Sequence, residues 1–156
     1  MAPLDRFFGM LSSSMPWLFY IPFSTLGYAA KWLSPQRFIQ SLESSLAEDD
    51  RQLLQDDELA LFFTVDVKEA FQQGVRGPAD DAILLYKDWG FKVEEIKSRV
   101  YLFHGTEDKF APYPFAEYLN TAIPDSELHN YPGRGHLFLI KLFEDVFSIL
   151  GESHLG

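Results

Sequence analysis

Hydrophobic positions recur along most of the chain at helical spacing. Between 35 and 47, apolar residues stand three and four positions apart, and Ser34–Pro35 supplies a helix start. The same spacing resumes after 48 and continues until glycines at 74 and 77 interrupt it. It returns over the shorter stretches 82–87, 112–122 and 137–150. The pattern therefore predicts amphipathic helices over most of the molecule.

Two short runs have a strand-like composition instead. They are Arg99–His104 and Ser126–Tyr131, and each ends in a loop that contains glycine. A helical stretch separates them, so the order is strand, loop, helix, strand, loop, helix. This order predicts a βαβα unit with parallel strands, which is typical of the α/β class. Because ligands of such sheets sit beyond the carboxyl ends of the strands, the two loops are expected at the same edge.

Each loop presents one side chain that catalysis can use: Asp108 after the first strand and His136 after the second. A neutral imidazole is a suitable base near neutral pH, and a carboxylate can hold it in one tautomer. Taken singly, Asp108 could cap the following helix, and His136 could simply begin the last helix. Taken together and in this order, they favour a catalytic pair.

Acidic runs elsewhere in the chain could in principle bind a metal ion. Glu48–Asp50 and Asp56–Glu58 each stand at an expected helix start, where carboxylates are stabilised by the helix dipole. We interpret both runs as solvated helix starts rather than as metal ligands. No metal and no cofactor is expected from the sequence.

The C-terminal motifs resemble those of the α/β-hydrolase superfamily. The residues that carry the resemblance are His104-Gly105-Thr106-Glu107-Asp108, Ile123-Pro124 and Gly133-Arg134-Gly135-His136. The resemblance implies a partial α/β-hydrolase fold, with a largely helical cap-like region at 1–77 and the C-terminal part of the core at 78–156. It also implies that Asp108 and His136 are the second and third members of a Ser-Asp-His triad.

A nucleophile is missing from this pattern. The G-x-S-x-G elbow of the family requires a strand before the serine and a helix after it. The stretch Gly151–Gly156 is one residue too long and follows a helix. The resemblance therefore implies a truncated serine hydrolase for esters or similar acyl substrates, inactive as an isolated chain. It would need a missing N-terminal half or another protein chain.

A non-enzymatic alternative is also open. The chain would then be a hydrolase remnant that binds an apolar ligand or a protein partner through its aromatic helical lobe. The sequence holds 15 Phe, 7 Tyr and 3 Trp, or 16% aromatic residues, which suit either a core or an apolar substrate.

Composition narrows the class of partner. The formal net charge of −10 argues against nucleic acid, because binding phosphates requires basic surface. The absence of cysteine excludes disulfides and thiol catalysis and fits a cytoplasmic protein. The apolar run 15–33 is broken by Pro16, Pro22 and Gly27, which favours short aromatic helices over a membrane element.

Overall fold

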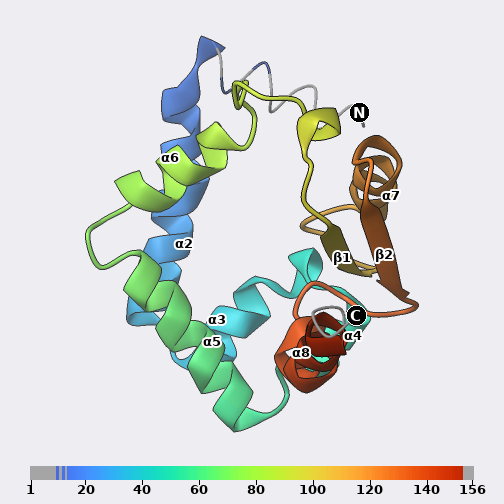
Figure 1. Cartoon of the computed structure of the whole chain (residues 1–156). Helices are drawn as coiled ribbons and strands as arrows, with labels where there is room; N and C mark the ends of the chain where they lie inside the picture. The colour runs from blue at the N-terminus through green and yellow to red at the C-terminus, as the bar shows by residue number, and fades with distance from the viewer. Residues whose placement is uncertain (1–9, 11, 13, 153–156) are drawn as a thin grey trace. The chain divides into compact units, whose positions relative to one another are not determined.

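The structure, a computed structural model, describes residues 10, 12 and 14–152 (Figure 1). The longer helices are α2 (Tyr20–Trp32), α3 (Pro35–Ser41), α4 (Glu48–Leu53), α5 (Asp57–Ala70), α6 (Arg76–Leu84), α7 (Tyr113–Ala122) and α8 (Phe143–Glu152). Short 3-10 turns are η1 (Pro16–Phe19), η2 (Glu43–Ser45), η3 (Val93–Glu95) and η4 (Phe138–Lys141). The strands are β1 (Val100–Gly105) and β2 (Ser126–Tyr131). No helix of the described residues is long and apolar enough to span a bilayer.

The two strands form the parallel pair that the sequence predicts. Their register runs from Val100 opposite Ser126 to Gly105 opposite Tyr131, and Figure 1 shows the two arrows side by side. Helix α7 connects the strands and packs against both of them. Its inward residue Ala116 and the following Ile123 are buried. The carboxyl ends of both strands therefore reach the same edge of the sheet.

Two compact units divide the described residues. One unit joins the described residues up to Leu42 with Asp57–Phe91, and the other joins Glu43–Asp56 with the described residues from Lys92 onward. The sequence-based prediction instead cuts the chain once, between residues 77 and 78. That position falls inside α6. The units differ from that division because residues 43–56 pack with the C-terminal segment. The assignment of cap and core as functional regions stays a prediction.

The helical unit is assembled around α2, which packs against α3, α5 and α6. Pro22 does not break α2 because it lies in the first turn, where a proline removes no intrahelical hydrogen bond. Gly27 allows close packing, since a Cβ there would stand 2.7 Å from Cδ1 of Phe71, the residue directly after α5. Phe38, fully buried, stacks on Phe63 with ring centroids 6.2 Å apart.

Three predicted helical runs are each divided in the structure. The run after 48 becomes α4 and α5, the run 35–47 becomes α3 and η2, and the run 137–150 becomes η4 and α8. The first division has a simple cause: α4 belongs to the unit with the sheet, whereas α5 belongs to the helical unit. Apolar spacing is the same on both sides of this turn, so the sequence pattern alone does not reveal it.

Candidate active site at Asp108 and His136

The structure brings together the two side chains that the sequence singled out. Asp108 lies three residues beyond β1, and His136 lies five residues beyond β2. Nδ1 of His136 is 2.8 Å from Oδ2 of Asp108. The Asp108 side chain is 6% exposed and the His136 side chain 46% exposed. A shielded carboxylate thus meets an imidazole that solvent can reach.

The carboxylate of Asp108 is held by its own loop. Its Oδ1 accepts hydrogen bonds from the backbone N–H groups of Phe110, at 2.8 Å, and Ala111, at 2.9 Å. Oδ2 remains for the imidazole. Helix α7 begins only at Tyr113, without a side-chain cap, so Asp108 closes a turn ahead of the helix rather than capping it. This anchoring fixes the direction in which Oδ2 points.

The imidazole of His136 is oriented by this contact. An ionised carboxylate only accepts hydrogen bonds, so Nδ1 carries the proton and Nε2 holds the lone pair in the neutral ring. No described residue forms a hydrogen bond with Nε2. The ring of Phe110 lies beside the imidazole, with centroids 5.1 Å apart. The arrangement is that of a base with its lone pair available.

The loop that carries His136 rests directly on the end of β1. Gly133 has a φ of +76°, which favours glycine, and its N–H donates to Oγ1 of Thr106 at 2.9 Å. The N–H of Glu107 donates to the carbonyl of Arg134 at 2.9 Å. A Cβ on Gly105 would come within 2.5 Å of the Arg134 carbonyl oxygen. The close approach of the two loops therefore requires glycine at 105.

Sequence reasoning missed a further residue of this site, Asp50. The acidic run 48–50 was interpreted as a solvated helix start, which is wrong for Asp50, because this residue is only 1% exposed. Its carboxylate accepts hydrogen bonds from the backbone N–H groups of His136 and Leu137. These partners lie 86 and 87 residues away in the chain, so no local spacing could have indicated them.

Neither a metal cluster nor a nucleophile accompanies the pair in the part of the chain that the structure describes. No group of three or more potential metal ligands occurs among those residues. The side-chain hydrogen bond that His136 makes is to Asp108, not to a serine. Ser153, in the stretch 151–156 weighed above, lies outside the described residues.

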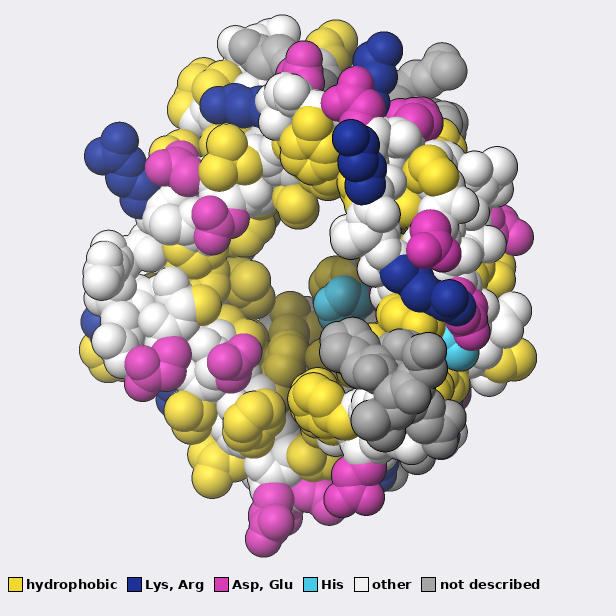
Figure 2. All heavy atoms as spheres, in the orientation of Figure 1, with side chains coloured by type: hydrophobic (Ala, Val, Ile, Leu, Met, Phe, Trp, Pro, Cys, Tyr) yellow, Lys and Arg dark blue, Asp and Glu magenta, His cyan; other side chains and the backbone are white. Residues whose placement is uncertain are grey.

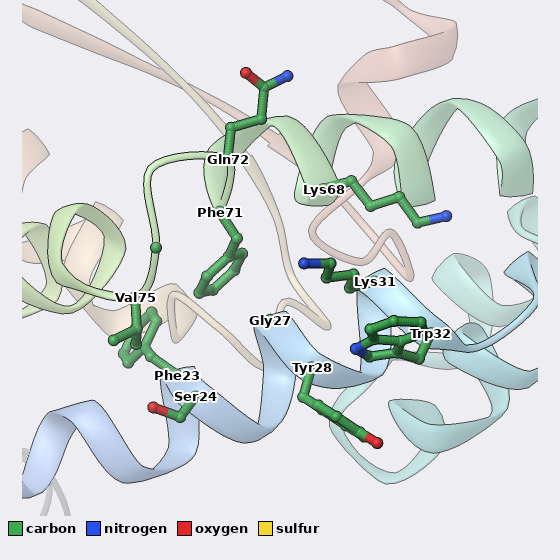
Figure 3. A pocket seen from close by; sticks show the side chains of 11 residues that line it. Phe23, Ser24, Gly27, Tyr28, Lys31, Trp32, Lys68, Phe71, Gln72 and Val75 are labelled. Atoms are coloured by element: carbon green, nitrogen blue, oxygen red, sulfur yellow. The ribbon is translucent and has the colours of Figure 1, made fainter.

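A second feature, the aromatic groove, lies in the helical unit between α2 and the end of α5. Its volume is about 590 Å³, and Figure 3 shows the side chains that line it. The lining consists of Phe23, Ser24, Gly27, Tyr28, Lys31, Trp32, Lys68, Phe71, Gln72, Gly74 and Val75. Tyr28 and Trp32 are 69% and 66% exposed. Figure 2 shows hydrophobic side chains, in yellow, on the visible surface beside acidic ones, in magenta.

Comparison with known proteins yields a likeness of fold. No family model matches the chain, and no curated protein sequence matches it. Among solved structures, an esterase from Exiguobacterium antarcticum is similar, with a TM-score of 0.56 and 20% sequence identity. The match covers 85% of this chain and 47% of the esterase, so the chain spans about half of that protein's length. At this identity the likeness concerns the fold alone.

Proposed function

We propose that Asp108 and His136 are the acid and the base of a serine-type hydrolase that cleaves esters or similar acyl substrates. The observation that carries the proposal is the 2.8 Å contact between an anchored carboxylate and an imidazole whose Nε2 is open. The esterase fold likeness supports the choice of reaction class. An apolar substrate fits the aromatic composition of the chain.

The chemistry follows from the two ring nitrogens of His136. Nε2 takes the proton of a serine hydroxyl while the serine oxygen attacks the acyl carbon. Asp108 stabilises the resulting imidazolium through Nδ1–H. The proton then passes from Nε2 to the departing alkoxide oxygen, which leaves as an alcohol. A water molecule repeats the sequence on the acyl-enzyme, releasing the carboxylic acid and restoring the serine.

In this proposal the serine comes from outside the described residues, either from an N-terminal half or from another protein chain. The isolated 156-residue chain is then expected to hydrolyse no ester. The fraction of the esterase that this chain matches, 47%, is consistent with a second portion of protein being needed.

The test uses the native polypeptide that carries this sequence, purified from its source, with p-nitrophenyl butyrate as substrate. We expect Asp108→Asn to lower kcat about 10⁴-fold, because an amide would favour the wrong imidazole tautomer. His136→Ala should cost at least about as much, because it removes the base. The matched control is Asp66→Asn, the same chemical change at an exposed position of α5.

Two results would contradict the proposal: full hydrolysis by the His136→Ala variant, or equal loss in the Asp66→Asn control. The intact mass of the native polypeptide decides where the serine resides. A mass well above 17.9 kDa places it on the same chain. A mass of 17.9 kDa together with hydrolysis requires a second chain.

The aromatic groove favours a second candidate function, the binding of an apolar ligand or a protein partner without catalysis. Here a native polypeptide of 17.9 kDa shows no hydrolysis. We expect dodecanol to bind the chain in titration calorimetry, and Trp32→Ala to weaken binding about tenfold by removing aromatic contact area. The matched control is Trp89→Ala, which is 56% exposed and outside the groove. Equal dodecanol affinity of the Trp32→Ala and Trp89→Ala variants would exclude the groove as the binding site.

A further inference from the structure

The segment that begins α4 contacts both loops of the candidate active site. Nζ of Lys109, next to Asp108, donates to the carbonyl of Leu46 at 2.8 Å. Asp49 accepts the N–H of Gly135 at 3.2 Å and pairs with the guanidinium of Arg134 at 2.8 Å. A short stretch far upstream in the chain therefore braces the loops that present the acid and the base.

Asp50 makes the most buried of these contacts. Its Oδ1 accepts the N–H of Leu137 at 2.8 Å, and its Oδ2 accepts the N–H groups of His136 at 3.1 Å and Ala47 at 3.2 Å. A buried carboxylate is costly unless such donors satisfy it. No lysine or arginine among the described residues forms an ion pair with Asp50. Its hydrogen-bond partners are thus backbone amides. Two of them, those of His136 and Leu137, lie on either side of the Cα atom of His136.

The backbone of the loop fits closely around this carboxylate. A Cβ on Gly135 would stand 2.3 Å from the carboxylate carbon of Asp50, so the loop leaves no space between them. His136 is consequently held at two points, by Asp50 at its backbone N–H and by Asp108 at its ring. Loss of the hydrogen bond between the His136 backbone N–H and Asp50 would allow the Cα of His136 to move and carry the ring away from Asp108.

We infer that Asp50 is a positioning residue, which holds the backbone at His136 so that Nδ1 stays within hydrogen-bond distance of Asp108. Its significance for catalysis rests on the proposed hydrolase function. Its effect on geometry does not, because the His136–Asp108 contact can be measured in the isolated chain. Asp50 touches no reacting atom and acts only through His136.

The test is the proton resonance of His136 Nδ1–H in the full 156-residue chain labelled with ¹⁵N. The wild-type chain should show one downfield signal that Asp108→Asn removes. Asp50→Asn keeps the size of the side chain but places an amide NH₂ against at least one backbone N–H. We expect this variant to remain folded and to lose the downfield signal. In the native polypeptide, kcat should fall about 10- to 100-fold with KM unchanged, because a small displacement of the base slows the chemical step.

Controls separate positioning from general destabilisation. Asp66→Asn should leave both the signal and kcat unchanged. If Asp50→Asn does not fold, Asp49→Asn decides, because Asp49 is more exposed and bonds the adjacent Gly135 amide; it should weaken the same signal. A folded variant with the wild-type Nδ1–H signal would overturn the inference. If Asp50→Asn loses the Nδ1–H signal but the native polypeptide has no esterase activity, the positioning role of Asp50 stands and the proposed hydrolase function is rejected.

Discussion

At the scale of single residues, Gly135 shows how tightly the site is built. Its Cα lies against the carboxylate of Asp50, and the residue is buried. In the sequence, Gly135 stands out only as part of the motif Gly133-Arg134-Gly135-His136. The structure shows a physical requirement for it, because any side chain at this position would displace either the loop or Asp50.

Gly135→Ala is therefore expected to lower the free energy of unfolding by about 1–3 kcal/mol, the range for overpacking a close-fitting site. Urea denaturation followed by circular dichroism measures the change. Gly151→Ala is the matched control, because this glycine lies in α8 with no atom near its Cβ position. It should be neutral or slightly stabilising, since alanine favours a helix. Equal stability of Gly135→Ala and wild type would show that the loop adjusts without cost.

At the scale of elements, the links between helices are specific as well as apolar. The hydroxyl of Tyr20 on α2 donates to a carboxylate oxygen of Asp80 on α6. Arg76, one turn earlier on α6, lies 3.5 Å from the same carboxylate. The sequence pattern predicts a helix over 82–87, whereas α6 begins at Arg76 and includes Gly77 and Asp80. The contact itself is not predictable from local spacing, because it joins residues 60 positions apart.

This contact predicts a pH dependence of stability. The hydrogen bond to Asp80, with desolvation and the negative charge of Asp80, raises the pKa of Tyr20 above its ordinary value. A pKa raised in the folded state adds stability below the unfolded pKa, and this stability is lost as pH rises through the folded pKa. The wild-type advantage over Tyr20→Phe in urea midpoint should persist to about pH 9 and shrink towards about pH 11.

The control for this experiment is Tyr28→Phe, at a tyrosine of the same helix that is 69% exposed. Its difference from wild type should not vary across the same pH range. If the Tyr20→Phe difference is also constant with pH, the hydrogen bond to Asp80 makes no contribution to folding.

At the scale of the whole molecule, the division into units does not follow the order of the chain. Residues 43–56 leave the helices on either side of them in sequence and join the unit that contains the sheet. The contacts of Asp49 and Asp50 with the His136 loop, and of Lys109 with Leu46, account for this grouping. The candidate site is consequently assembled from an early segment and two late loops.

Much of the fold near the site was predictable for a local reason. Alternation between strand-like runs and helical spacing is recorded in neighbouring residues, and parallel strands must present their carboxyl ends together. These two facts were enough to expect Asp108 and His136 at one edge, where the structure has them 2.8 Å apart. Their catalytic role stays a prediction for the experiments above.

The sequence by itself determined the parallel βαβ unit, the helical character of the remainder and the two loop residues. Only the tertiary structure decided that α4 separates from α5, that Asp50 is buried, and that its carboxylate holds the His136 loop. The physical reason is that side-chain periodicity reports which face of an element is buried. It does not report which backbone amides, 86 residues later, will satisfy a carboxylate on that face.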